Sequence, residues 1–117
     1  MQREMTAPQF AAPATRGNIL VIDDEMDIRE GLEMLLQSEG YAVDLAQNGT
    51  EGLHKLENHA YDLVLLDLMM PDKSGMEVLA ETRERDRETP IVMITAYGSV
   101  EAAVRALKLG ANDYFSK

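Results

Sequence analysis

Short apolar runs alternate along this chain with longer segments in which apolar residues recur at helical spacing. The runs are nearly continuous and rich in branched residues, a pattern typical of strands buried on both faces of a parallel sheet. They predict five strands, at residues 18–22, 41–45, 61–67, 91–94 and 112–115. The segments between them carry apolar residues three or four positions apart, which predicts four amphipathic helices.

The four predicted helices are identified by their apolar positions. These are Ile28, Leu32, Leu35 and Leu36 in the first, Leu53 and Leu56 in the second, Met76, Leu79 and Ala80 in the third, and Val100, Ala103, Val104 and Leu107 in the fourth. Gly40 and Gly110 follow as stop signals, and Pro71, Asp72 and Ser74 mark a turn before the third helix. Strict alternation of strands and helices predicts an α/β fold: a doubly wound, five-stranded parallel sheet with helices on both faces.

Composition limits the classes of protein to consider. The 117 residues fit one domain, and the absence of cysteine excludes disulfides and thiolate metal sites. A net charge of −10 would repel a phosphate backbone, so we expect no direct nucleic-acid binding. Residues 1–17 lack the apolar core of a secretion signal, and no apolar stretch is long enough to span a bilayer. We therefore expect a flexible N-terminal tail, no membrane association and a cytoplasmic location.

The residues that end the predicted strands carry the candidate chemistry. In open parallel sheets, ligands bind beyond the carboxyl ends of the strands. Asp23 and Asp24 follow the first strand, and Asp67 ends the third. Thr95 follows the fourth strand, and the fifth runs towards Lys117. We therefore expect three carboxylates, a hydroxyl and an ammonium group to converge on one edge of the sheet.

This combination of groups predicts magnesium-dependent phosphoryl chemistry. Three carboxylates at one place repel one another, and a hard divalent cation that prefers oxygen ligands, such as Mg²⁺, would neutralise them. A carboxylate beside that ion can attack phosphorus and form an aspartyl phosphate. The charge on the other phosphoryl oxygens then needs balancing donors, and Lys117 and Thr95 fit this role.

Four motifs follow one another along the chain: VIDDE, VLLDLMMPDKSGMEVL, VMITAYGS and LGANDYFSK. In this order they resemble the receiver domain of bacterial two-component response regulators, over residues 18–117. The resemblance implies a chemotaxis-Y-like, flavodoxin-like fold with strand order 2-1-3-4-5. The stretch ITAYGSVEAAVRALKLGANDYFSK is most similar to receivers of sigma-54-dependent transcriptional activators of the nitrogen-regulatory-C (NtrC) type.

Carried over by position, the resemblance makes Asp67 the phosphoacceptor. It implies that Asp24 and Asp67 bind Mg²⁺ directly, that Asp23 binds it through water, and that the main-chain carbonyl of Met69 is a further ligand. These positions are expected to form the metal and acceptor part of the site.

The remaining matched positions would respond to the phosphoryl group. Thr95 would hydrogen-bond it and shift towards it, with help from the main-chain amides of Leu68 and Ala96. Lys117 would pair with it electrostatically. Tyr114 matches the aromatic position that changes between outward and inward rotamers when that threonine moves, so we expect a switch formed by Thr95 and Tyr114.

The resemblance also implies partners and one missing element. A sensor histidine kinase would donate the phosphoryl group, and phosphorylation would alter self-association, such as homodimer formation, or control an output domain in a longer protein, with transcription as the expected output. A full receiver closes with a fifth helix after the lysine, whereas this sequence ends at Lys117. We therefore expect residues 18–117 to form a receiver truncated before its fifth helix, with an apolar patch over the central strands.

Several of these residues could instead have a purely structural role. Asp24 could cap a helix, Asp67 could begin a turn, and Tyr114 could be a half-buried sheet residue. His54 and His59 are expected to be exposed and to have no metal role. The eight methionines fit core filling or a partner surface better than cofactor binding.

Two other functions remain open from the sequence. A magnesium-dependent phosphatase or mutase would use Asp67 as a transient nucleophile. That chemistry generally adds an acid/base carboxylate two residues later, where this chain has Met69, and a cap over the site. A phosphorylation-independent dimerisation module would keep the fold without the chemistry. The sequence favours a phosphoacceptor switch over both, and hence a protein that is not an enzyme.

Overall fold

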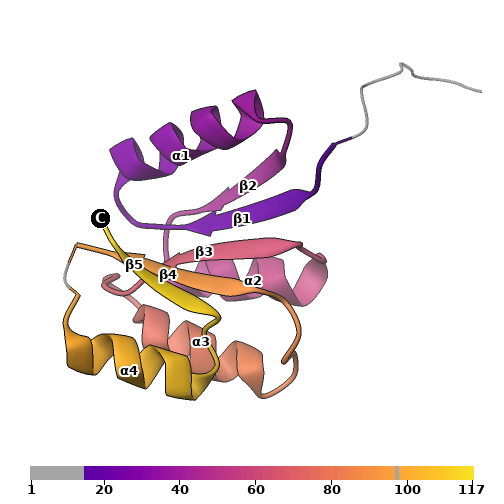
Figure 1. Ribbon diagram of the computed structural model, residues 1–117. Helices are drawn as coiled ribbons and strands as arrows, with labels where there is room; N and C mark the ends of the chain where they lie inside the picture. The colour runs from indigo at the N-terminus through magenta and orange to yellow at the C-terminus, as the bar shows by residue number, and fades with distance from the viewer. Residues whose placement is uncertain (1–14, 97) are drawn as a thin grey trace, which may run out of the picture.

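The computed structural model describes residues 15–96 and 98–117, and it contains five strands and four helices in strict alternation (Figure 1). In chain order these are β1 (Asn18–Ile22), α1 (Met26–Ser38), β2 (Ala42–Ala46), α2 (Gly49–Asn58), β3 (Leu63–Asp67), α3 (Gly75–Arg83), β4 (Ile91–Thr95), α4 (Val100–Leu109) and β5 (Asp113–Ser116). The predicted alternation is confirmed; β1 has the predicted boundaries, and those of the other four strands differ from the predicted ones by one or two residues. At β2 the reason is local, because the N–H of Tyr41 donates to the carbonyl of Leu36 and closes the turn after α1.

The predicted N-terminal tail falls mainly on residues 1–14, which lie outside the described part of the chain. Just after it, Arg16 donates its N–H to the carbonyl of Gly40, and the carbonyl of Gly17 accepts from Ala42. The chain is therefore hydrogen-bonded beside β2 before β1 begins.

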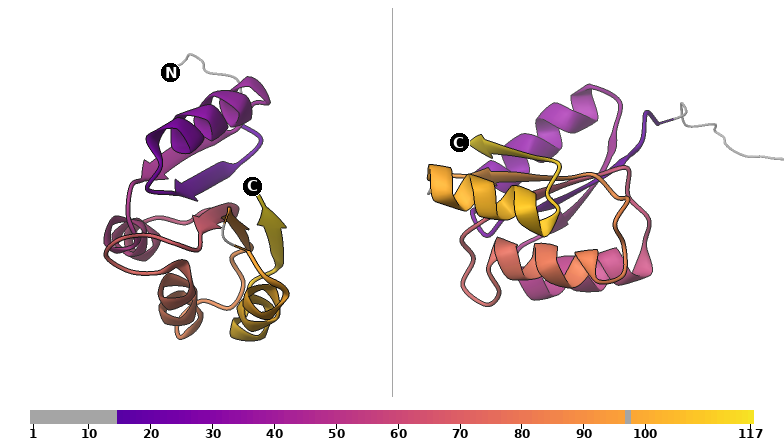
Figure 2. Two further views of the ribbon diagram at one scale, coloured as in Figure 1. Left: turned by 90° about the vertical axis from the view of Figure 1, so that its left-hand side faces the viewer. Right: turned by 60° about the horizontal axis from the view of Figure 1, so that its bottom comes forward.

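The strands form one parallel sheet in the order β2-β1-β3-β4-β5, as the resemblance implied. Helix α1 covers one face, and α2, α3 and α4 cover the other (Figure 1 and Figure 2). Ile22 lies level with Leu66, and Asp67 lies level with Ile94. Because neighbouring strands run in the same direction in this register, the carboxyl ends of β1, β3 and β4 meet at one edge of the sheet.

The main core lies between the sheet and the three helices on one face. Alternate strand residues point into it, namely Leu20, Ile22, Val64, Leu66, Ile91 and Met93, and all are fully buried. The helices contribute Leu53, Val78, Leu79 and Ala106. Burial of branched side chains on this scale is the dominant stabilising term for such a domain, and it fixes the strands whose ends carry the polar residues.

The opposite face is covered only in part. Ile19 and Val21 of β1 are buried on the face that carries α1. On the same face by strand alternation and register, four residues of β3 and β4 are only half-buried: Leu63, Leu65, Val92 and Ile94. Phe115 of β5 is 55% exposed. Among the described residues no helix follows β5, and this row of apolar side chains agrees with the predicted apolar patch.

Helix α4 packs on the sheet through small side chains rather than through its predicted apolar positions. Ala106 is its buried residue, whereas Val100, Val104 and Leu107 are exposed. The exposed residues form an apolar stripe on the outer side of α4, since they lie three or four positions apart. None of the helices in the described residues combines the length and the apolar character needed to cross a membrane.

Candidate functional site

The carboxyl edge of the sheet brings together four of the residues predicted for the site. Asp23 follows β1, Asp67 ends β3, Thr95 ends β4, and Lys117 follows β5. The ammonium nitrogen of Lys117 lies 2.9 Å from Oδ2 of Asp23 and 3.6 Å from Oδ2 of Asp67. Lys117 is held in place by its backbone, because its N–H donates to the carbonyl of Thr95 at 2.8 Å. The predicted convergence is therefore present for Asp23, Asp67 and Lys117, and Thr95 ends the strand beside Asp67.

Asp67 is the most strongly perturbed carboxyl group of the site. It is 4% exposed, and its Oδ1 atom has no hydrogen-bond partner among the described residues. Burial raises the pKa of Asp67 from the ordinary 3.8 to about 6, with a further contribution from repulsion by Asp23, although the charge of Lys117 acts in the opposite direction. A buried carboxylate with one open oxygen and a raised pKa is typical of a reactive position rather than of a turn.

Lys117 supplies the positive charge nearest to these carboxylates. Burial alone would lower the pKa of Lys117, but hydrogen bonds to Glu25 and Asp23 and the charge of Asp67 outweigh burial and hold the pKa above its usual value. Its side chain is only 12% exposed. The amine is therefore charged at any physiological pH and is directed into the site.

Glu25 is a member of this cluster that the sequence interpretation did not single out. Its carboxylate lies 2.8 Å from the amine of Lys117, and one carboxylate oxygen each from Asp23, Glu25 and Asp67 lie within 4.8 Å of one another. The sequence feature that could have indicated this role is that Glu25 is the third acidic residue of the VIDDE motif. The side chain reaches the site because the N–H of Glu25 donates to Oδ1 of Asp23, which turns the chain back over the strand end.

Asp24, the predicted direct magnesium ligand, is exposed at the rim of the site. It lines a surface hollow of about 390 Å³ together with Glu25, Asp67, Met69, Met70 and Pro71. Three oxygen ligands close together suit a hard divalent cation, and Asp23, Glu25 and Asp67 form such a set. The role of Asp24 itself stays a prediction.

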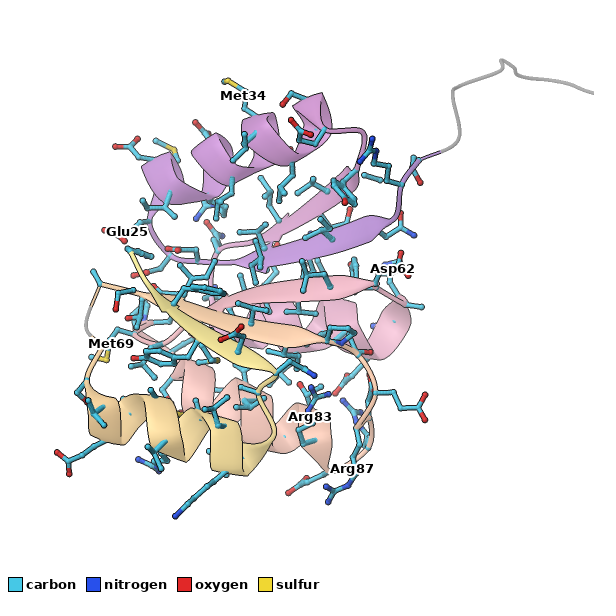
Figure 3. All side chains as sticks on the ribbon, viewed as in Figure 1. Glu25, Met34, Asp62, Met69, Arg83 and Arg87 are labelled. Carbon is cyan, nitrogen blue, oxygen red and sulfur yellow. The ribbon has the colours of Figure 1, made fainter. Side chains whose placement is uncertain are left out.

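The loop between β3 and α3 forms one wall of this hollow. Met69 is half-exposed there, and Figure 3 shows Met69 and Glu25 at the same end of the sheet, with Asp62 and Arg83 at the other. The loop closes at Gly75, whose N–H donates to the carbonyl of Leu68. A Cβ atom on Gly75 would lie 2.2 Å from the carbonyl oxygen of Asp67, so a residue without a side chain is required.

The predicted switch residues lie on the neighbouring strands β4 and β5, two residues apart in register. Thr95 is fully buried. Met93, two residues before Thr95, is level with Tyr114. The hydroxyl of Tyr114 is buried without a hydrogen-bond partner among the described residues, and a Cβ atom on Gly98 would lie 2.9 Å from it. Tyr114 therefore points inward towards the segment after β4. Its change of rotamer stays a prediction, as do the roles of the amides of Leu68 and Ala96.

The two histidines lie in and just after α2. Both His54 and His59 are exposed, and His59 packs edge-on against the ring of Tyr61. Neither belongs to a group of potential metal ligands among the described residues.

Comparison with known proteins gives consistent results. The response regulator receiver domain family matches residues 19–117. The uncharacterized transcriptional regulatory protein YkoG of Bacillus subtilis is 45% identical over 102 residues, which is 87% of this chain and 45% of that protein. The chain therefore spans less than half the length of this curated relative.

Two solved structures are similar in fold and in sequence. The response regulator TrrA of Thermotoga maritima, in complex with Mg²⁺ and beryllium fluoride, has a TM-score of 0.79 and 43% identity, with coverage of 86% of this chain and 85% of that chain. NtrX of Brucella abortus has a TM-score of 0.80 and 35% identity, with coverage of 86% and 23%. With the parallel sheet and the acidic strand ends described above, these matches show that the chain belongs to the response regulator receiver domain family.

Proposed function

We propose that this chain is a phosphorylation switch of a two-component system and that Asp67 accepts the phosphoryl group. The observation that carries the proposal is the environment of Asp67, a buried carboxylate with an open oxygen beside Asp23 and Lys117. Its pKa of about 6 leaves most of the carboxylate ionised at neutral pH, as a nucleophile must be.

The proposed reaction is a displacement at phosphorus. One carboxylate oxygen of Asp67 forms the new P–O bond, while the P–N bond to the phosphohistidine of a sensor kinase breaks. The imidazole leaves with the electron pair of that bond and takes up a proton. Lys117 would balance charge on the transferred group, and Thr95 would donate its hydroxyl hydrogen to it. The chain then acts as an acceptor that assists its own phosphorylation and dephosphorylation, not as an enzyme acting on other substrates.

The carboxylates of this site fit a magnesium ion. Asp23, Glu25 and Asp67 bring oxygen atoms within 4.8 Å of one another, and the open Oδ1 of Asp67 is a free ligand atom among the described residues. We propose Asp23, Asp24, Asp67 and the main-chain carbonyl of Met69 as ligands, with Glu25 as an additional candidate. When bound, Mg²⁺ would neutralise charge on the carboxylates and on the transferring phosphoryl group. The magnesium complex of TrrA supports this choice of metal.

Phosphorylation would be transmitted through β4 and β5. Movement of Thr95 and Lys117 towards the phosphoryl group would change the position of Tyr114 and the packing of α4, which shifts a population of conformers already present. The exposed stripe of Val100, Val104 and Leu107 would be affected directly. We propose that this surface controls homodimer formation or an output domain in a longer cytoplasmic protein, and that the output is transcription.

The motifs support the assignment to a subfamily less strongly than the assignment to the family. The last motifs favour receivers of the NtrC type, and the likeness to NtrX points the same way. The curated relatives include transcriptional regulators such as YkoG, which are of the OmpR/PhoB type and more similar in sequence. We therefore propose a transcriptional regulator as the parent class and favour the OmpR/PhoB type.

The proposal is tested by the intact mass of the chain after incubation with acetyl phosphate, with and without Mg²⁺. We expect one phosphoryl adduct that requires Mg²⁺ and is absent from Asp67→Asn. A folded chain that gains no adduct would support a phosphorylation-independent dimerisation module. Continuous release of phosphate from many small phosphate esters would support the phosphatase or mutase alternative.

A further inference from the structure

The loop of residues 68–74 connects Asp67 to α3 and carries the carbonyl of Met69 proposed as a metal ligand. Its α3 end is fixed by a capping box, in which the hydroxyl of Ser74 accepts from the N–H of Glu77, and the carboxylate of Glu77 accepts from the N–H of Ser74. These hydrogen bonds hold the residues next to α3 and do not reach the middle of the loop.

Asp72, in the middle of the loop, is bound to the first turn of α2. Its carboxylate accepts hydrogen bonds from the N–H of Gly49 at 3.1 Å, the N–H of Thr50 at 2.9 Å and the hydroxyl of Thr50 at 2.5 Å. These N–H groups have no partner within the helix, and the helix dipole favours a negative charge at this end. The contact joins segments 22 and 23 residues apart.

The backbone geometry shows a second, independent sign of this docking. A Cβ atom on Gly49 would lie 2.7 Å from Cβ of Lys73 and 2.8 Å from its carbonyl oxygen. The loop therefore rests directly on the backbone of α2, at a distance that only glycine permits. Hydrogen bonds from Thr50 hold the pKa of Asp72 well below its usual range, so the carboxylate stays charged at any physiological pH.

We propose that Asp72 is a positioning residue for the metal site: it fastens the 68–74 loop to α2 so that the carbonyl of Met69 is held towards Asp67. This inference rests on the function proposed above. Asp72 does not touch the metal and acts through the loop. Partners that orient metal ligands typically contribute a factor of roughly 10 to 100 in metal affinity or activity.

The test is the affinity for Mg²⁺, measured by titration calorimetry, of the parent chain and of Asp72→Ala. Asp86→Ala is a matched control. Asp86 lies in the loop between α3 and β4 and accepts hydrogen bonds from the N–H groups of Glu88 and Thr89 and from the hydroxyl of Thr89. Each substitution therefore removes one negative charge and three similar hydrogen bonds, but only Asp72 lies in the loop that carries Met69.

We expect Asp72→Ala to weaken Mg²⁺ binding roughly ten-fold and Asp86→Ala to leave it unchanged, while both lower the melting temperature. Asp72→Asn, which keeps an acceptor oxygen without the charge, should be intermediate and covers the case in which the alanine variant does not fold. Equal Mg²⁺ affinities of the parent and the folded Asp72 variants would overturn the inference. A parent chain that binds no Mg²⁺ would instead overturn the proposed metal site.

Discussion

Removing the charge of Asp67 should stabilise the fold in the absence of metal. Asp67 is buried among carboxylates and has one oxygen without a hydrogen bond, and its pKa is raised to about 6. A folded state that binds a proton more tightly than the unfolded state loses stability as the pH rises between the two pKa values. The penalty is therefore complete above about pH 6 and absent below about pH 4. Asp67→Asn has no such penalty.

The size of the effect follows from the pKa shift. The rise from 3.8 to about 6 costs the folded state about 3 kcal/mol at neutral pH, at about 1.4 kcal/mol per unit. Asparagine still buries a polar group, so we expect a net gain of about 1–3 kcal/mol in the free energy of unfolding. For a domain of this size that corresponds to a rise of about 4–12 °C in the melting temperature.

The assay is thermal and urea unfolding, followed by circular dichroism in the presence of a chelator, at about pH 8 and about pH 4. The stability difference between Asp67→Asn and the parent should be largest at the higher pH and nearly vanish at the lower. Asp24→Asn is the control, because Asp24 is exposed and contributes less than Asp23 to the raised pKa of Asp67. It should give a smaller gain. Equal stabilities at the higher pH, or a difference that does not depend on pH, would refute this explanation.

Three further substitutions test other parts of the structure by urea unfolding. Arg83 is buried and donates to the carbonyls of Gly110, Asp86 and Thr89 and to the side chain of Asn112. Arg83→Met should therefore lower the free energy of unfolding by about 2–4 kcal/mol. A loss under about 1 kcal/mol would show that the contacts are not formed. Tyr114→Phe removes a buried hydroxyl that has no partner among the described residues and should leave stability unchanged or raise it by about 1 kcal/mol, whereas a clear loss would reveal a hydrogen bond. Gly75→Ala places a methyl group against the Asp67 carbonyl, so it should lower the free energy of unfolding by about 1–3 kcal/mol and also slow phosphorylation of Asp67. An unchanged free energy of unfolding would contradict the close approach.

The sequence predicted the architecture because each element has its own local pattern. Branched runs such as NILVI are typical of buried strands, and the apolar spacing around Leu32 and Leu53 is typical of helices. Parallel strands then bring their carboxyl ends together, so the convergence of Asp23, Asp67 and Lys117 followed from the order of elements alone.

The remaining features depend on contacts that the local pattern does not contain. Both Asp24 and Glu25 are exposed, but only Glu25 pairs with Lys117. The N–H of Glu25 donates to the carboxylate of Asp23, and this contact sets the direction of the turn. Asp72 was expected only to mark a turn, and its bonds to Thr50 join distant parts of the chain. The exposure of Val104 depends on how closely α4 approaches the sheet, which its small buried residue Ala106 determines.

The central claim is that Asp67 carries the phosphoryl group, and its most direct test is to locate the modification by residue. The chain is treated with acetyl phosphate and Mg²⁺ and then reduced with borohydride, which converts an aspartyl phosphate to homoserine, and peptides are sequenced by mass spectrometry. We predict homoserine at position 67 and at no other carboxylate, with none formed when Mg²⁺ is omitted. Homoserine at Asp23 or Asp24, or at no residue of a folded chain, would contradict the account.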